Sequence, residues 1–283
     1  MRKKIFSVCF IFLFLCLFLS GEETTPLILV SNDDGISSPG LKALAEEMTK
    51  LGRVLVVAPK NNMSGSSHSQ NSRTATFYGE SDILPGVEAY WVDNTPVNCI
   101  SWAINYLLDG RIPDLVLSGI NIGVNPGESV HYSGTVGAAR EGALSGAVAL
   151  AVSYMAQGEN NDYQGVAQIT RILAEKALSI GETHLLWNVN FPAGKIDESR
   201  KIVVAKLSRS RWKTHYTARK NLSGKTYFWF NAKLVYKGEE TDTDLVALMN
   251  GAITVAPVLI DTTDYNALER MKDLFSSAEE KSE

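Results

Sequence analysis

The chain is poor in cysteine, and most of what it has lies at one end. Of the three cysteines among 283 residues, Cys9 and Cys16 fall in an N-terminal apolar run, which leaves Cys99 alone in the remainder. One cysteine cannot form an intramolecular disulfide, so the fold beyond that run does not depend on disulfide cross-links. No histidine or acidic pattern surrounds Cys99, and we expect a small buried residue there, not a nucleophile.

The chain also lacks an excess of positive charge. Its 27 lysines and arginines are outnumbered by 31 acidic residues, which gives a formal net charge of -4. A partner for the backbone of duplex DNA or long RNA needs a basic stripe, so we exclude long nucleic acid as a ligand. With 45% hydrophobic and 20% charged residues, the composition is that of a globular protein, and a small anion bound locally is compatible with it.

Several catalytic signatures are absent as well. The sequence has no GxGxxG after its first apolar strand, no GxxxxGK[ST] phosphate loop, no GxSxG nucleophile elbow and no DxDx[TV] motif. The four histidines show no HExxH or other ligand spacing, which argues against a zinc site. They are His68, His131, His184 and His215.

Residues 1–21 have the layout of an export signal. Basic residues at 2–4 precede an apolar run at 5–19, and small residues follow at 20–21. The run is somewhat shorter than a membrane span of roughly 20 residues and no Ala-x-Ala site follows it, so an uncleaved anchor is the alternative to a cleaved signal peptide. We expect a periplasmic or membrane-anchored protein that touches the membrane only through this segment.

Beyond this leader, short apolar runs alternate with amphipathic stretches. Buried strands are predicted at 27–30, 53–59, 87–92, 114–119 and 147–154, with helices at 39–52, 96–108 and 134–146. Continuous apolar strands separated by helices are typical of a parallel sheet covered on both faces. We therefore predict an α/β fold with a doubly wound, mostly parallel sheet.

The second half of the chain has a different pattern. Its predicted elements are a helix, a strand, a β-rich hairpin extension, a closing strand and a last helix, at 164–180, 185–192, 201–236, 253–260 and 261–275. The aromatic residues of the extension and its turn at Ser223 and Gly224 suggest a hairpin that reaches another subunit. One domain then covers residues 22–275, and a polar tail covers 276–283.

Polar residues follow the predicted strands where each strand ends. NDDG at 32–35, SGSSHS at 64–69 and SGINIGVN at 118–125 come after three strands, and HYSGT at 131–135 leads into a helix. Ligands of open parallel sheets bind outside the carboxyl ends of the strands. We therefore expect these segments to converge on one site.

The adjacent carboxylates Asp33 and Asp34 raise the question of what tolerates two like charges side by side. A solvated turn is one answer, because Asn, Asp and Gly are common turn residues. A cation is the other, since it would relieve the repulsion, and carboxylate, hydroxyl and amide oxygens suit Mg²⁺, Mn²⁺ or Ca²⁺ better than zinc.

YSGT at 132–135 offers either a plain N-cap or free N–H groups that cradle a phosphate. A metal beside such a cradle indicates phosphoryl chemistry.

Four segments, in this order and spacing, resemble the SurE family of survival-protein nucleotidases. They are LILVSNDDG at 27–35, VVAPKNNMSGSSHS at 56–69, DLVLSGINIGVN at 114–125 and YSGTVGAAREG at 132–142. The resemblance runs from about Pro26 to beyond Pro257. It implies a Rossmann-like core, a β-hairpin exchanged within a homodimer or homotetramer, and metal-dependent hydrolysis of nucleoside monophosphates. The activity implied is that of a 5′-nucleotidase, and an additional 3′-nucleotidase activity stays open.

The resemblance also assigns residues to the site. It places one divalent cation, Mg²⁺ or Mn²⁺, on Asp33, Asp34, Ser64 and Asn121. It places active-site polar groups on or near Asn32, Gly65, Asn125, Ser133, Gly134 and Thr135. The residues expected to act in catalysis are Asp33, Asp34, Asn125, Ser133 and Thr135.

Several alternatives stay open at this point. A metal-bound water or Asp33 is the nucleophile; the substrate is a nucleotide, a sugar phosphate or short polyphosphate; and a nonhydrolytic exported binding protein is a further interpretation. Tyr132 and Trp212 either stack on a base or serve packing. Two features depart from the family: Asn94 stands where glycine is common, and typical members are cytoplasmic without a leader, so a cytoplasmic location is the alternative to export.

Overall fold

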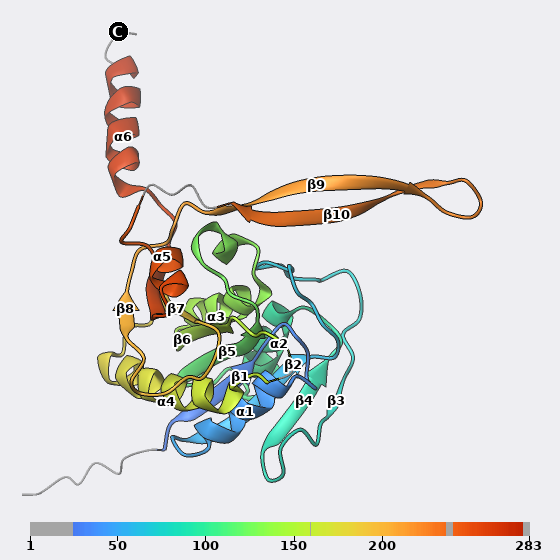
Figure 1. Ribbon diagram of the computed structural model, residues 1–283. Coiled ribbons are helices and arrows are strands. Elements are labelled where there is room, and N and C mark those ends of the chain that lie inside the picture. The colour runs from blue at the N-terminus through green and yellow to red at the C-terminus, as the bar shows by residue number, and fades with distance from the viewer. Residues whose placement is uncertain (1–24, 159, 236–239, 280–283) are drawn as a thin grey trace, which may run out of the picture.

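Figure 1 shows the computed structural model, which describes residues 25–158, 160–235 and 240–279. The predicted leader at 1–21 lies outside the described residues, as does the end of the predicted polar tail, 280–283. Within those described ranges, no helix combines the length and the apolar character that crossing a membrane requires.

A single nine-stranded sheet forms the centre of the molecule, in the order β3-β4-β2-β1-β5-β6-β7-β11-β8. Its strands are β1 (Leu27–Ser31), β2 (Arg53–Pro59), β3 (Tyr78–Glu80), β4 (Glu88–Val92), β5 (Leu115–Ile122), β6 (Val148–Tyr154), β7 (Leu185–Phe191), β8 (Ile202–Val204) and β11 (Ile253–Leu259). Pairing is parallel except where β3 meets β4 and where β11 meets β7. The predicted α/β fold with a mostly parallel sheet is confirmed.

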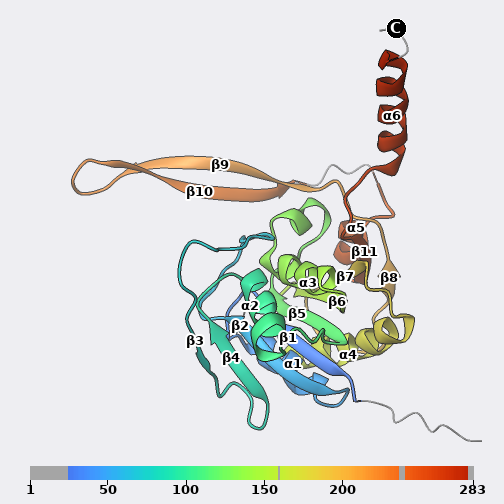
Figure 2. The same cartoon turned by 180° about the vertical axis from the view of Figure 1, so that it is seen from behind.

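Two pairs of helices cover the two faces of this sheet (Figures 1 and 2). On one face, α1 (Pro39–Met48) packs against α4 (Tyr163–Ile180), and on the other, α2 (Pro96–Trp102) packs against α3 (Gly134–Leu144). Strand β1 serves both layers, because its side chains alternate: Ile28 belongs to the core beneath α1 and α4, and Leu29 to the core beneath α2. The continuous apolar runs in the sequence follow from this two-sided burial.

Some elements differ from their predicted bounds. The predicted helix at 96–108 is α-helical only as far as Trp102 and continues as a π-helix over Ala103–Leu107. The short β3 and the helix α5 (Asp244–Met249) were not predicted. The last helix, α6 (Tyr265–Glu279), begins later than expected and takes in the start of the predicted tail. Cys99 is buried as expected, and burial raises the pKa of its thiol.

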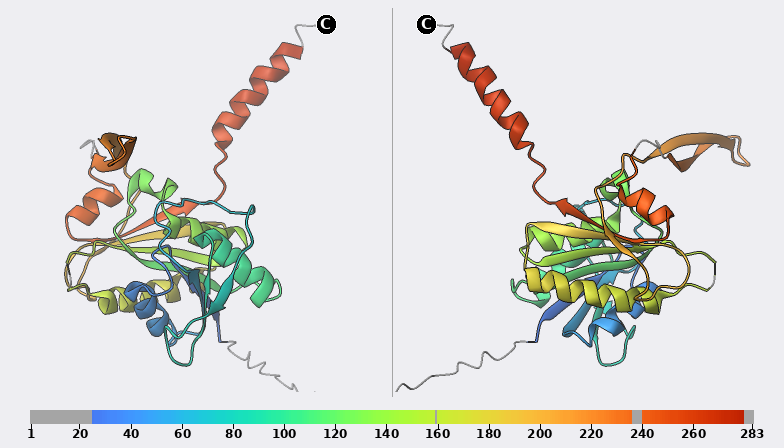
Figure 3. Two further views of the ribbon diagram at one scale, coloured as in Figure 1. Left: turned by 90° about the vertical axis from the view of Figure 1, so that its right-hand side faces the viewer. Right: turned by 60° about the vertical axis from the view of Figure 1, so that its left-hand side comes forward.

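The predicted hairpin is present as β9 (Arg211–Lys220) and β10 (Thr226–Val235), an antiparallel pair with its own sheet. It projects from the body of the molecule, as Figures 1 and 2 show, and α6 projects separately in Figure 3. Pairing and alternation place Tyr216, Phe228 and Phe230 on the same face, where their exposed fractions are 58–66%. The single chain therefore leaves an aromatic face of the hairpin open to solvent.

Candidate active site

The turn after β1 is held by Asn32, whose side-chain amide bonds twice to one residue. Asn32 Nδ2 donates to the carbonyl of Gly35 at 3.0 Å, and Asn32 Oδ1 accepts the Gly35 N–H at 3.1 Å. Gly35 has φ of +103°, a conformation that glycine adopts without strain. Asn32 thus fixes the turn that presents Asp33 and Asp34, and its amide groups are occupied by that turn.

Asp33 is buried against the start of α3. The Thr135 hydroxyl donates to Asp33 Oδ1 at 2.6 Å, and a Cβ added to Gly134 would lie 2.8 Å from Asp33 Oδ2, which only a glycine avoids. Burial raises the pKa of Asp33, although the Thr135 hydroxyl and the backbone N–H groups of Thr135 and Gly134 favour the ionised form. The helix start predicted as a phosphate cradle therefore faces a carboxylate, and Thr135 contacts Asp33 from behind the pocket.

Asp34 turns the other way, towards the end of β5. Its Oδ2 accepts the Ile122 N–H at 2.9 Å, and its Oδ1 accepts from Asn62 Nδ2 at 3.4 Å. Burial, more than the charge of Asp33, raises the pKa of Asp34 to about 6, against the effect of the Ile122 N–H. Both neighbouring carboxyls thus have raised pKa values, and a cation bound to these carboxylates would favour their ionised forms.

The loop that carries Ser64 and Gly65 is tied at both ends to the rest of the site. The Met63 N–H donates to the Asp33 carbonyl at 2.7 Å, and the Ser67 N–H donates to the Tyr132 carbonyl at 3.1 Å. Tyr132 follows the 3-10 helix η2 (Gly127–His131). The loop is therefore held between the end of β1 and the segment that leads into α3.

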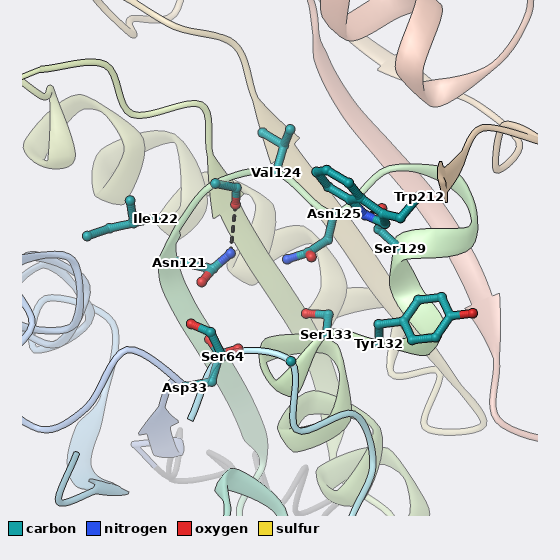
Figure 4. Close-up of a pocket in the computed structure, with 12 residues that line it drawn as sticks. Asp33, Ser64, Asn121, Ile122, Val124, Asn125, Ser129, Tyr132, Ser133 and Trp212 are labelled. Carbon is teal, nitrogen blue, oxygen red and sulfur yellow. Dashed lines mark hydrogen bonds between the residues drawn. The ribbon is translucent and has the colours of Figure 1, made fainter. Parts of the chain in front are cut away.

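Two asparagines come from β5 and the segment after it (Figure 4). Asn121 Nδ2 donates to the Gly123 carbonyl at 2.7 Å, which leaves Asn121 Oδ1 directed towards the side of the pocket that holds Asp33 and Ser64. Asn125 faces the pocket next to Ser133. The Ser133 hydroxyl oxygen accepts the Val136 N–H at 3.1 Å as the N-cap of α3, so its own hydrogen is available to a ligand.

These side chains line a pocket of about 390 Å³ at the carboxyl ends of the strands. The predicted site residues that line it are Asp33, Ser64, Gly65, Asn121, Asn125 and Ser133. Asp34 lines a neighbouring pocket of about 320 Å³, and Asn32, Gly134 and Thr135 are not among the lining residues of either. The volume is sufficient for a small ligand.

The far wall of the pocket contains the aromatic candidate Trp212 and one residue, Ser129, that the sequence did not single out. Ser129 lines it from η2, and Trp212 lines it from the base of β9. The Trp212 indole N–H donates to the Ser129 hydroxyl at 2.9 Å, so the two are joined. Trp212 was an aromatic candidate from the sequence, whereas no sequence pattern indicated Ser129, which lies in a short helix just before HYSGT.

The donor set fits a hard divalent cation. Asp33 and Asp34 supply carboxylates, Ser64 a hydroxyl and Asn121 an amide oxygen that is turned forward because its nitrogen is bonded to Gly123. All four are oxygen ligands of the kind that Mg²⁺ and Mn²⁺ prefer. In the described part of the chain, no cluster of three or more His, Cys, Asp or Glu side chains is placed to hold a metal, so any cation here depends on neutral oxygens as well.

The residues that form this pocket lie within a match to a known protein family. The family model for the survival protein SurE matches residues 28–214. The chain belongs to the SurE family. That match covers every segment that forms the pocket, from the turn after β1 to Trp212 at the base of the hairpin.

Relatives within the SurE family match almost end to end. A protein of Thermus thermophilus named 5′-nucleotidase SurE 1 is 41% identical over 253 residues, which is 87% of this chain and 97% of that protein. The 5′-nucleotidase SurE of Cytophaga hutchinsonii is 38% identical over 247 residues, 87% of this chain and 95% of that protein. The crystal structure of the SurE protein from Aquifex aeolicus superposes with a TM-score of 0.75 at 34% identity, covering 88% of this chain and 99% of that one.

Proposed function

We propose that this SurE-family protein hydrolyses nucleoside monophosphates to a nucleoside and phosphate, as a metal-dependent 5′-nucleotidase. The observation that carries the proposal is the convergence of Asp33, Ser64, Asn121, Asn125 and Ser133 in one pocket. Oxygen ligands for a cation lie on one side of that pocket, and amide and hydroxyl donors for phosphate lie on the other. The relatives in Thermus and Cytophaga carry the name 5′-nucleotidase, which supports the same activity.

Asp33, Asp34, Ser64 and Asn121 would hold one divalent cation, Mg²⁺ or Mn²⁺. Such a cation, when bound, supplies Lewis-acid polarisation of a phosphoryl oxygen and lowers the pKa of a water ligand. Within the chain, Thr135 and the start of α3 stabilise the ionised form of Asp33. These bonds occupy Asp33 on the α3 side and support its role as a ligand over its role as nucleophile.

The phosphate would be held by the groups opposite the carboxylates. The Ser133 oxygen accepts the Val136 N–H, so its hydroxyl can donate to a phosphate, and the Asn125 side chain faces the pocket beside it. Donors aimed at the place where negative charge develops stabilise the transition state more than the ground state. Tyr132 and Trp212 border the same pocket and give the nucleoside an aromatic wall.

Self-association and export belong to the same proposal. The hairpin presents the aromatic face of Tyr216, Phe228 and Phe230 on strands that project from the body, which suits a contact with a second copy in a homodimer or homotetramer. The leader at 1–21 has the composition of an export signal or membrane anchor. We propose that the protein acts outside the cytoplasm.

A phosphate-release assay tests the proposed activity. The purified protein is given 5′-AMP, 3′-AMP, glucose 6-phosphate or tripolyphosphate, each with Mg²⁺, Mn²⁺ or EDTA, and Asp34→Asn serves as the inactive control. We expect release from 5′-AMP that depends on the metal and disappears in the variant. Faster release from glucose 6-phosphate or tripolyphosphate would identify a sugar phosphate or polyphosphate as the substrate in place of a nucleotide. A folded protein that releases no phosphate would point to a binding role.

A further inference from the structure

Two asparagines of β7 hydrogen-bond to the backbone of Asn125. The Asn125 N–H donates to Asn190 Oδ1 at 2.7 Å, and Asn188 Nδ2 donates to the Asn125 carbonyl at 2.9 Å. Both backbone groups of one pocket residue are thus bonded by side chains more than sixty positions away in the sequence. These two contacts fix where the Asn125 peptide lies relative to the sheet.

The same two asparagines are placed where a polar side chain is unfavourable. β7 runs between β6 and β11, and both Asn188 and Asn190 are fully buried. Because side chains alternate along a strand, both point to the face of the sheet that α3 covers, as Leu186 does. Their register partners on β6 are Ala151 and Ser153, which are also buried.

Each asparagine uses only half of its amide. Among the described residues, Asn188 Oδ1 and Asn190 Nδ2 have no hydrogen-bond partner. A buried polar atom without a partner is destabilising, so an apolar pair would stabilise the sheet better. The groups that are bonded are those that reach Asn125, so the contact with this pocket residue is what distinguishes the asparagines from an apolar pair.

A third contact directs the side chain of Asn125 itself. Asn125 Nδ2 donates one hydrogen to the Ser153 hydroxyl on β6 at 2.8 Å. An amide nitrogen carries two hydrogens, so the second is available to a ligand in the pocket. With the backbone held from β7 and the side chain held from β6, the amide has one defined orientation.

We propose that Asn188 and Asn190 are positioning residues that set Asn125 in the pocket and so orient its amide towards the substrate phosphate. Neither asparagine lines the pocket, and both act through Asn125. The inference rests on the proposed function only for the identity of the ligand, because the two hydrogen bonds to the Asn125 backbone are part of the fold. A displaced donor weakens transition-state contacts even when the protein remains folded.

A matched pair of variants tests the direction of the two bonds. Asn188→Asp and Asn190→Asp place the same buried carboxyl on the same strand and face. Asn188→Asp removes the N–H donor that bonds to the Asn125 carbonyl and sets an oxygen against that carbonyl. Asn190→Asp keeps the accepting oxygen and loses only an N–H group that has no partner among the described residues.

We expect kcat/KM for 5′-AMP at pH 8 to be about tenfold lower in Asn188→Asp than in Asn190→Asp, the effect of one lost hydrogen bond of about 1.4 kcal/mol. A role confined to sheet packing predicts equal losses in the two variants, because the carboxyls are matched in size and burial. Equal losses, or a larger loss in Asn190→Asp, would overturn the proposal.

A second measurement needs neither activity nor a stable Asn188 variant. Amide hydrogen exchange of the Asn125 N–H, followed by NMR in the wild-type protein, reports the bond to Asn190 directly. We expect a protected amide that stays protected in Asn190→Asp and exchanges at least tenfold faster in Asn190→Ala. Fast exchange in the wild type would contradict the hydrogen bond between the Asn125 N–H and Asn190 and overturn the proposal. A wild-type protein with a protected amide and no phosphate release would overturn the proposed function alone.

Discussion

The strand ends of the sheet and the β9–β10 hairpin use side chains in opposite ways. At the strand ends, polar groups such as Asp33 and Asn190 are buried and hydrogen-bonded. On the hairpin, the aromatic side chains of Phe228 and Phe230 are 62% and 58% exposed. The strand ends bury polar groups that water would solvate, and the hairpin exposes apolar groups that are more stable away from water.

This contrast shows which property each region supplies. Buried, bonded polar groups have one defined geometry, which is what binding and chemistry require. An exposed aromatic face gains stability only when another surface covers it, which is what association requires. We therefore expect substitutions at the strand ends to change chemistry and substitutions on the hairpin to change association, and the two regions meet at Trp212.

The largest effect is expected from Asp33→Asn. This change removes a carboxylate from the proposed cation site but keeps the shape of a side chain that is 3% exposed. Loss of several kcal/mol of metal-dependent stabilisation corresponds to a fall of about a thousandfold in kcat/KM for 5′-AMP. Sedimentation should show unchanged association, since the hairpin is untouched.

Asp114→Asn is the matched control for this carboxylate. Asp114 accepts the Leu27 N–H at 2.7 Å at the opposite end of β1, so it also supports this strand but lies away from the pocket. Its variant should keep kcat/KM within about twofold of the wild type. Metal-dependent hydrolysis that survives undiminished in Asp33→Asn would remove Asp33 from the proposed cation site.

A smaller effect is expected from Gly134→Ala at the start of α3, because Gly134 lies against Asp33 at the end of β1. The new Cβ would lie 2.5 Å from Ser66 Oγ and 2.8 Å from Asp33 Oδ2, so Asp33 must move. In a helix interior alanine is favoured over glycine by about 1 kcal/mol; Gly134 is the first residue of α3, so only part of this gain offsets the strain. We expect kcat/KM to fall by about 10–100-fold, the usual range for a supporting residue, while the melting temperature changes little.

The control for Gly134→Ala is Ser145→Ala at the other end of α3, where the Ser145 hydroxyl donates to the Glu141 carbonyl at 2.9 Å. Steady-state kinetics and thermal unfolding of both variants separate a local displacement of Asp33 from a weakened helix. If Gly134→Ala unfolds at a much lower temperature and loses activity only in proportion, the close approach to Asp33 has no specific role.

On the hairpin, Phe230→Glu should weaken association without changing the chemistry. Phe230 belongs to the aromatic face with Tyr216, whereas Trp229 points to the other face and has the same exposed fraction, 58%. A buried aromatic contact contributes about 2 kcal/mol or more at an interface, so we expect dissociation to be favoured roughly 30-fold. Sedimentation velocity of Phe230→Glu and of Trp229→Glu distinguishes the two faces, and equal effects would show that the aromatic face is not the contact.

Much of the fold followed from the sequence because most residues of the buried parallel strands are apolar, so each strand reads as a nearly continuous apolar run. The runs at 27–30, 53–59 and 147–154 predicted strands for this reason. β3 was missed because three residues at a sheet edge carry no period, and its pairing with β4 is fixed by contacts distant in sequence. α5 was missed because six residues are too few for a helical pattern.

The candidate site was only partly predictable. The convergence of Asp33, Ser64 and Asn121 follows from the strand ends, since every parallel strand delivers its next residues to the same edge. The direction of each side chain does not follow. Thr135 hydrogen-bonds to Asp33, and Asn188 hydrogen-bonds to the Asn125 carbonyl, 63 positions away in the sequence. Both contacts depend on packing between α3, β5 and β7, which no local sequence pattern encodes.

Trp212→Phe tests the place where the two regions meet, and we expect the smallest effect from it. Trp212 belongs to the hairpin yet lines the pocket and donates to Ser129 at 2.9 Å, so phenylalanine keeps an aromatic ring but loses that bond. A net loss of about 0.5–1 kcal/mol should raise KM for 5′-AMP by about two- to fivefold with kcat nearly unchanged. Trp229→Phe, on the same hairpin away from the pocket, should leave both constants as they are. A fall in kcat in Trp212→Phe would instead mean that the hairpin takes part in the chemical step, and the separation between the two regions would not hold.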